Sequence, residues 1–199
     1  MKNSIRFLIS LFVVAACSAE SPTPVSEPAP TRDTPYAAGS STVFLHDESR
    51  PYDSVAGIDE GMRTLITEIW YPVDHEVAAS GDYRRATYGD YVFGNRDVHE
   101  LMMTKTTFFH LTAGTVKDGV SAEQIDDAIE ALFHRERASY VDAPVAESDT
   151  PWPVIVMSHG DAGSRYNMES LTEHLAANGY IVIAPEHTGN SPYSMTGHD

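Results

Sequence analysis

The feature that most constrains the fold is a pair of apolar segments late in the chain, separated by a turn and a helix. The first is "PVIVMS", residues 153–158, and the second is "YIVIAPEH", residues 180–187. Neither segment alternates polar with apolar residues, which is typical of parallel strands buried on both faces. Between them, "MESLTEHLAANG" predicts a helix that stops at Asn178-Gly179. Together they predict a βαβ unit and an α/β fold.

The turn after the first segment, "SHGDAG", predicts a ligand site. Ligands of parallel α/β sheets bind beyond the carboxyl ends of the strands. Glycines let the backbone turn tightly, so that N–H groups approach a bound oxygen. Fixed N–H donors at such a position stabilise an oxyanion that develops during a reaction.

Two strands are expected earlier in the chain, at residues 41–47 and 62–73, because both are rich in β-branched and aromatic residues. The segment "GIDEG", residues 57–61, predicts the turn between them, and Pro72 closes the second strand. We expect the two strands to be antiparallel neighbours. Residues 75–97 show no clear period.

Two helices are expected in the middle of the chain, at residues 98–111 and 121–138. Ser121 and Gln124 have the spacing of a capping box. Apolar residues then recur at helical spacing and form one face: Ile125, Ala128, Ile129, Leu132 and Phe133.

The first 17 residues form a candidate signal peptide. Lys2 and Arg6 precede the apolar run "FLISLFVVAA". As a helix this run would span about 15 Å, half of the ~30 Å hydrocarbon core, so it is too short for a membrane span. Residues 18–39 are rich in Pro, Ser and Ala and predict a disordered tether. The globular domain is expected over residues 40–199.

The only cysteine, Cys17, ends the motif "VAAC", which resembles the lipobox of bacterial lipoproteins. That resemblance implies that Cys17 is lipidated and anchors an exported protein to a membrane. Ser18 at the next position implies delivery to the outer membrane in a Gram-negative cell, at its periplasmic face or at the cell surface. The alternative is an ordinary secretory signal and a secreted protein.

Charge and histidine spacing exclude two kinds of partner. The net charge is −16, with 13 basic and 29 acidic residues, so the phosphates of a nucleic acid would be repelled. No pair of histidines has the spacing of a metal site, so no metal is expected. The scattered histidines are His46, His75, His99, His110, His134 and His174.

The segment from "PVIVMSHGDAG" to "APEHTGNS", with "TEIWYPV" upstream, resembles the platelet-activating factor acetylhydrolase class of α/β-hydrolases. The resemblance covers about residues 40–199. It implies a mixed sheet, with antiparallel strands followed by a parallel βαβ unit. It also implies a cofactor-free serine hydrolase that cleaves short acyl esters, including phospholipid-type substrates. Dienelactone-hydrolase-like and polyester-cleaving enzymes share the "HG" turn and remain alternatives.

Carried over by position, the backbone N–H of Asp161 is one donor of the oxyanion hole, and His159 and Gly160 shape the loop. An aspartate departs here from the apolar residue common in the family, and its carboxylate must point away from an oxyanion. The catalytic base of the family is a histidine later in the chain, so His187 is expected at the rim of the site.

The nucleophile elbow G-x-S-x-G of this fold is missing from the sequence. The nearest match, "GNSPY" around Ser191, lacks the second glycine, and Pro192 has no N–H to donate. We therefore expect the amino-terminal half of a hydrolase, lacking nucleophile, acid and base, and inactive alone. The alternatives are a non-catalytic surface lipoprotein or binding module, and a split enzyme completed by another chain.

Overall fold

A computed structural model describes residues 33–53, 58–91, 121–161, 163–188 and 190. Its elements are β1 (Ala37–Asp53), β2 (Ile58–Val73), α1 (His75–Ala79), β3 (Arg85–Thr87), the 3₁₀ helix η1 (Tyr88–Tyr91), α3 (Ala122–Phe133), β4 (Glu136–Val141), β5 (Val154–Val156), α4 (Glu169–Ala177) and β6 (Ile181–Pro185). The signal peptide and the tether up to residue 32, and the predicted helix at 98–111, lie outside the described residues.

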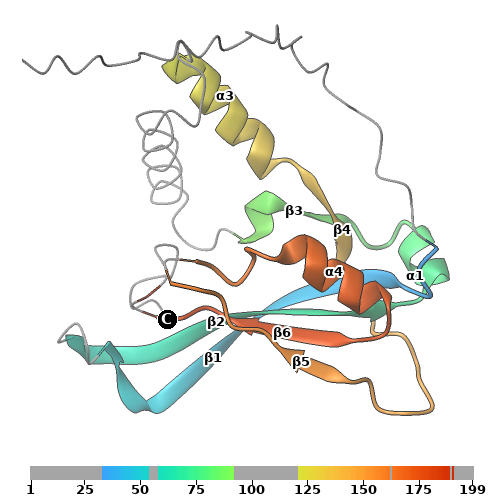
Figure 1. The fold of residues 1–199 in the computed structure, drawn as a ribbon, viewed down its shortest axis with the longest axis horizontal. Coiled ribbons are helices and arrows are strands. Elements are labelled where there is room, and N and C mark those ends of the chain that lie inside the picture. Colours follow the sequence, from blue (N-terminus) through green and yellow to red (C-terminus); the bar gives the residue numbers. More distant parts are fainter. Residues whose placement is uncertain (1–32, 54–57, 92–120, 162, 189, 191–199) are drawn as a thin grey trace, which may run out of the picture. The chain divides into compact units, whose positions relative to one another are not determined.

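The strands form one mixed sheet in the order β3-β4-β1-β2-β6-β5 (Figure 1). β1 and β2 are antiparallel, and β2 also pairs antiparallel with β6. β5 and β6 are parallel. The expected α/β architecture, with antiparallel strands followed by a parallel βαβ unit, is therefore confirmed.

The βαβ unit consists of β5, α4 and β6. α4 crosses one face of the sheet (Figure 1), and Ala176 joins Trp70 and Val182 in the buried core beneath it. The helix ends as predicted, because Gly179 has a φ of +89°, a conformation that favours glycine.

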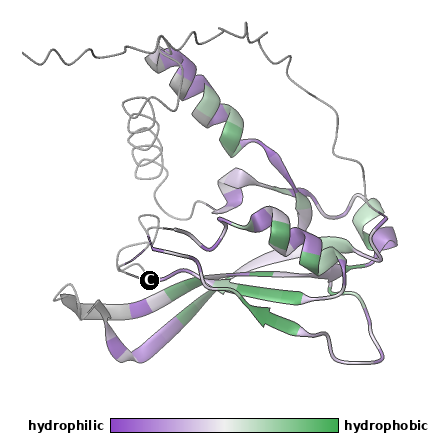
Figure 2. Ribbon diagram, viewed as in Figure 1, coloured by the Kyte–Doolittle hydropathy of each residue, from purple (hydrophilic) through white to green (hydrophobic). Residues whose placement is uncertain are grey.

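The prediction that the first apolar segment is buried on both faces is wrong. Val154 and Val156 are 56% and 72% exposed, whereas Ile155 packs against the core. β5 lies at the edge of the sheet, and α4 covers only the other face. Figure 2 shows the apolar character of β5 and β6. In the part of the chain that the structure describes, no element covers the face of β5 that carries Val154 and Val156.

The antiparallel pair is confirmed, with different boundaries. β2 begins at Ile58, so residues 58–61 belong to the strand and not to the expected turn. It ends at Val73, one residue after Pro72. β1 runs from Ala37 to Asp53, beyond the expected residues 41–47 at both ends. Pairing between the two strands is continuous from Ala37↔Val73 to Asp47↔Arg63, which extends both beyond their most apolar segments.

The capping box of α3 is confirmed in both directions, because the Ser121 side chain accepts from the Gln124 N–H and the Gln124 side chain from the Ser121 N–H. The helix ends at Phe133, however, and residues 136–138 lie in β4 and not in the helix. Pairing of β4 with β1 and β3 overrides the helical pattern there.

The short elements α1, β3 and η1 lie in the segment that showed no period. Among the described residues, no helix is both long and apolar enough to cross a membrane.

Candidate functional site

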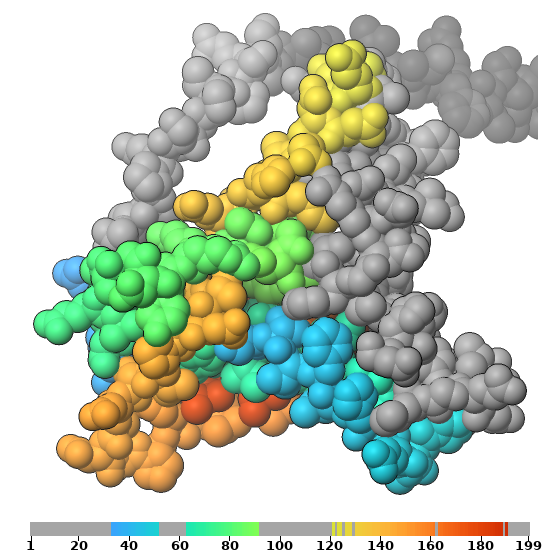
Figure 3. Space-filling view, turned by 180° about the vertical axis from the view of Figure 1, so that it is seen from behind, coloured from blue at the N-terminus to red at the C-terminus, as the bar shows by residue number. Residues whose placement is uncertain are grey.

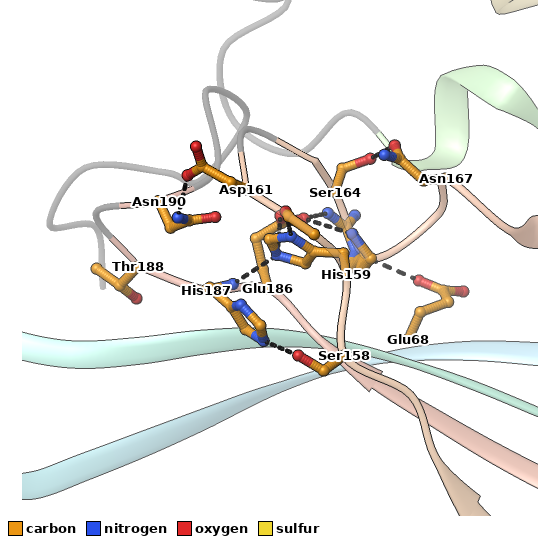
Figure 4. Close-up of polar contacts among 12 residues, drawn as sticks. Glu68, Ser158, His159, Asp161, Ser164, Asn167, Glu186, His187, Thr188 and Asn190 are labelled. Atoms are coloured by element: carbon orange, nitrogen blue, oxygen red, sulfur yellow. Dashed lines mark hydrogen bonds and ion pairs between the residues drawn. The ribbon is translucent and has the colours of Figure 1, made fainter.

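The βαβ unit brings two short polar segments together at one end of the sheet. Ser158 and His159 follow β5, and Glu186 and His187 follow β6 (Figure 4). Because the two strands are parallel neighbours, their carboxyl ends meet at the same edge. The predicted site residues His159, Gly160 and Asp161 all lie at this edge.

The ring of His159 is buried and held on both nitrogens. Nδ1 donates to the Gly160 carbonyl over 2.8 Å, and Nε2 accepts from the backbone N–H of His187 over 3.0 Å. A carbonyl oxygen can only accept, so Nδ1 carries a proton. The rings of His159 and His187 stack with centroids 4.0 Å apart. His159 thus ties the turn after β5 to the end of β6.

His187 forms a pair with Ser158, which sequence reasoning missed. The Ser158 Oγ lies 3.1 Å from the His187 Nε2. Burial, and then the nearby His159, lower the pKa of His187, which favours a neutral ring at pH 7. Among the described residues, nothing hydrogen-bonds the other ring nitrogen of His187, so this pair has no orienting acid.

The turn itself is closed by backbone contacts. The N–H of Gly163 donates to the Gly160 carbonyl over 3.0 Å. A Cβ on Gly163 would lie 2.9 Å from the Gly160 oxygen and 3.3 Å from the His159 Nδ1. A Cβ on Gly160 would meet nothing within 4 Å. Close packing therefore requires glycine at 163, while Gly160 borders open space.

The side chain of Asp161 is engaged by Asn190. The Asn190 Nδ2 donates to the Asp161 Oδ1 over 2.6 Å. Figure 4 shows this carboxylate directed toward Asn190 and away from His159 and Glu186. The contact holds the charge of Asp161 on the side of the loop that follows β6.

A buried charge cluster lies behind the loop, and the sequence did not predict it. Arg165 and Glu186 are each 1% exposed. The Arg165 Nη1 donates to the Glu186 Oε2 over 2.9 Å, and its Nη2 donates to the Tyr91 carbonyl over 2.6 Å. The Glu186 Oε1 lies 3.2 Å from the His159 Nε2. The cluster therefore joins η1, the turn after β5 and the end of β6.

Glu68, in the middle of β2, faces the same cluster. Its Oε2 lies 3.8 Å from the Arg165 Nε and accepts from the Thr42 hydroxyl over 2.6 Å. Burial raises the pKa of Glu68 to about 7, against the lowering effect of Arg165.

Glu68 also lines a cavity of about 370 Å³. The segments around it meet on the face shown in Figure 3. The lining is mostly polar and comes from β1, β2, η1 and the end of β4: Ser40, Ser41, Thr42, Glu68, Arg84, Ala86, Gly89, Asp90, Tyr91, Val141 and Asp142.

Two further predicted positions, Cys17 and Ser191, lie outside the described residues. Within the described ranges, no group of three His, Cys, Asp or Glu side chains could hold a metal ion.

A mixed sheet with a parallel βαβ unit and a Ser-His-Gly turn after its first strand defines an α/β-hydrolase type of domain. Residues 56–197 match the family model described as platelet-activating factor acetylhydrolase, isoform II. This match covers more than half of the chain, which therefore belongs to that family.

A ferulic acid esterase from Streptomyces cinnamoneus is structurally similar, with a TM-score of 0.49 and 24% sequence identity. The match covers 86% of this chain and 38% of the esterase, so the chain spans well under two thirds of that protein's length. No curated protein matches the chain significantly.

Proposed function

We propose that this chain is the amino-terminal part of a serine carboxylic-ester hydrolase that, when complete, cleaves short acyl esters of lipid type. The family supports the ester substrate. The observation that carries the proposal is the turn after β5, where the backbone N–H of Asp161 stands at the carboxyl end of a parallel strand while its carboxylate bonds Asn190.

In the proposed reaction, a serine oxygen attacks the ester carbonyl carbon while a histidine takes the serine proton. The carbonyl oxygen becomes an oxyanion, and the Asp161 N–H donates to it. The alcohol then leaves with the proton, and water cleaves the acyl-enzyme in the same way. Each such donor contributes about 3 kcal/mol of barrier lowering.

We assign the nucleophile, its acid and its base to polypeptide other than residues 1–199. Ser158 is a poor nucleophile, because its partner His187 lacks an orienting acid among the described residues. One face of β5 is covered by no element that the structure describes, which also supports an incomplete domain, since parallel strands are normally covered on both faces. Val154 and Val156 supply an apolar surface for further elements of the hydrolase.

Activity measurements test the proposal. The protein produced from its complete reading frame should hydrolyse p-nitrophenyl acetate and butyrate, and a serine-reactive phosphonate should abolish turnover. Residues 33–199 produced alone should give no turnover above the buffer. Phosphonate-sensitive turnover by residues 33–199 would refute the incomplete-enzyme proposal, and an inactive complete protein would refute the esterase.

We also propose that the protein is exported and anchored to a membrane through a lipid on Cys17. The lipobox-like "VAAC" supports this. Cells fed radiolabelled palmitate should label the protein and place it in the membrane fraction. The Cys17→Ser variant should lose both the label and the membrane association. A Cys17→Ser variant that still fractionates with membranes would refute this anchor.

A further inference from the structure

The polar cavity described above forms where β4 leaves β1. The two strands pair only through Gly39↔Tyr140 and Ser40↔Val141, and the chain then turns at Asp142, which has a φ of +52°. The part of β1 beyond this pairing and the 3₁₀ helix η1 border a space of about 370 Å³, a size typical of small-ligand sites. Among the described residues that line it, none comes from the ends of β5 and β6.

A buried carboxylate lines this cavity with one oxygen that has no hydrogen bond. Glu68 is 3% exposed. Its Oε2 accepts from the Thr42 hydroxyl over 2.6 Å and lies 3.8 Å from the Arg165 Nε. Within the described ranges no donor bonds the other oxygen, Oε1, and Figure 4 shows it directed away from Arg165. Buried polar atoms are normally hydrogen-bonded, so Oε1 indicates a donor that binds there.

The hydroxyl of Ser40 is a second buried group of this kind. Ser40 is also 3% exposed and lines the cavity, and no hydrogen bond to its Oγ comes from the part of the chain that the structure describes. Thr42, two residues further along β1, is the register partner of Glu68 on β2. Side chains two residues apart on a strand share a face, so Ser40 and Glu68 lie on the same face of the sheet.

The positive charge behind Glu68 is shared between two carboxylates. Arg165 lies 3.8 Å from Glu68 but 2.9 Å from Glu186. An ionised carboxylate is costly to bury without its own partner. Burial accordingly raises the pKa of Glu68 to about 7. A cation bound at the Oε1 of Glu68 would supply the charge that Arg165 does not.

The lining of the cavity adds further negative charge. Its described charged residues are Glu68, Asp90, Asp142 and Arg84. Arg84 already donates to the two carboxylate oxygens of Asp90 over 2.8 and 2.6 Å. Asp142 accepts from the Ser41 hydroxyl rather than from a cation. The potential in the cavity therefore favours a positive ligand.

From the cavity, its two buried oxygens and the charge of its lining, we propose that this site binds a small primary ammonium compound. An ammonium has three N–H donors and no acceptor, which suits the Glu68 Oε1 and the Ser40 Oγ as acceptors. The site shares no residue with the turn after β5, so the proposal stands apart from the esterase.

Two other kinds of cation fit this cavity less well. A metal ion needs several ligands, and the described residues provide no group of three His, Cys, Asp or Glu side chains that could hold one. A quaternary ammonium has no N–H to donate and is held by aromatic faces. The aromatic residue that lines the cavity, Tyr91, is already stacked on Tyr166 with centroids 5.0 Å apart.

Backbone-amide chemical-shift titrations test the binding in the protein produced from its complete reading frame. Ethanolamine is the probe, ethylene glycol is a neutral control of nearly the same size, and tetramethylammonium is a charged control without N–H donors. Ethanolamine should shift the amides of Ser40 and Thr42 with a Kd in the millimolar range, and should bind about tenfold or more tightly than either control. Shifts that never saturate, or equal affinity for either control, would overturn the proposal.

Substitutions locate the site. Glu68→Gln keeps the shape and removes the charge, so it should weaken ethanolamine binding by about tenfold or more. Ser40→Ala removes one acceptor and should weaken it by about fivefold. Glu173→Gln is the matched control, because Glu173 is also buried beside an arginine, Arg137, but bonds β4 and does not line the cavity. Its affinity should equal that of the wild type. Equal affinities in Glu68→Gln and Glu173→Gln would contradict the assignment.

The pH dependence of binding gives a test that needs no variant. The charged groups facing Glu68 are Arg165 from the segment before α4, Asp90 from η1 and Asp142 from the end of β4. With a pKa of about 7, Glu68 gains its charge between pH 6 and 8, while an alkylammonium stays protonated. Ethanolamine should therefore bind about tenfold more tightly at pH 8 than at pH 6. Equal affinity at both pH values would overturn the proposal, and none of these measurements requires esterase turnover.

Discussion

The side-chain amide of Asn190 holds the carboxylate of Asp161 over 2.6 Å. The two residues lie 29 positions apart in the sequence, so their contact links the turn after β5 to the segment after β6. The backbone N–H of Asp161 is the proposed donor to an oxyanion, and a nearby carboxylate would repel that oxyanion. The Asn190 amide holds the Asp161 carboxylate on one side of the loop, which makes the two groups of this residue compatible.

Releasing that carboxylate should harm catalysis. At about 5 Å, and with an effective dielectric constant near 20, a carboxylate raises the energy of an oxyanion by about 3 kcal/mol. Asn190→Ala should therefore lower kcat of the complete enzyme, and Asp161→Asn should leave it equal to or above the wild-type value. Asp149→Asn, an exposed position before the amino end of β5, is the control. A wild-type kcat in Asn190→Ala would show that the contact is irrelevant to the reaction.

The two glycines of the loop should respond differently to a methyl group. Gly163→Ala places a Cβ 2.9 Å from the Gly160 oxygen and 2.9 Å from the Asn167 Nδ2. We expect the free energy of unfolding to fall by about 1–3 kcal/mol, as for other overpacked sites. Gly160→Ala meets no neighbour and should unfold at the wild-type temperature. Thermal unfolding followed by circular dichroism gives both values, and equal losses would contradict the packing argument.

Glu68 should make the protein less stable as the pH rises. Its pKa is about 7 in the folded protein and about 4.5 when exposed, so the folded state binds the proton more tightly. This stabilisation is complete below about pH 4.5 and is lost as the pH rises to about 7, and amounts to about 3 kcal/mol. Glu68→Gln should flatten the dependence of unfolding free energy on pH in this window. Urea titrations at pH 5, 6, 7 and 8 measure the unfolding free energy of both proteins. The same pH dependence in wild type and Glu68→Gln would refute a raised pKa of Glu68 in the folded protein.

Ser158 should be dispensable for the chemistry. Ser158→Ala removes a hydroxyl that bonds the His187 Nε2 over 3.1 Å, but not a nucleophile. We expect the phosphonate to label the complete Ser158→Ala protein at the wild-type rate. Peptide mass spectrometry should find the label at another serine. A label on Ser158 in the wild-type protein would instead assign it the nucleophilic role.

The βαβ unit could be predicted because its signals are local. An apolar run, a glycine after the helix and a second apolar run each report one element and its end. The capping box of α3 is equally local. The strand β4 could not be predicted, since "ERASYV" carries charges and follows a helical pattern without a glycine or proline between them. Its strand conformation comes from pairing with β1 and β3, which lie far away in sequence.

The loop of the site was predictable from the Ser-His-Gly turn, but its support was not. Arg165 and Glu186 are charged residues next to turns, and such residues are normally exposed. Their burial depends on each other and on the Tyr91 carbonyl, which only the folded chain brings close. The exposure of Val154 and Val156 was missed for the opposite reason, because a run of apolar residues does not report which neighbours cover it.

The pairing of β2 with β6 has a consequence for how the protein folds. β1 and β2 form one piece that is continuous in sequence, and β5, α4 and β6 form another, so each can assemble from near neighbours. The β2–β6 pairing joins the two pieces, from Trp70↔Val182 to Thr67↔Pro185. Among the strand pairings of the described sheet, it brings together the residues that are farthest apart in the sequence. Contacts of this kind are slow to form. Glu186 and His187 directly follow the last paired residue of β6. The candidate site should therefore be among the last parts of the protein to become ordered.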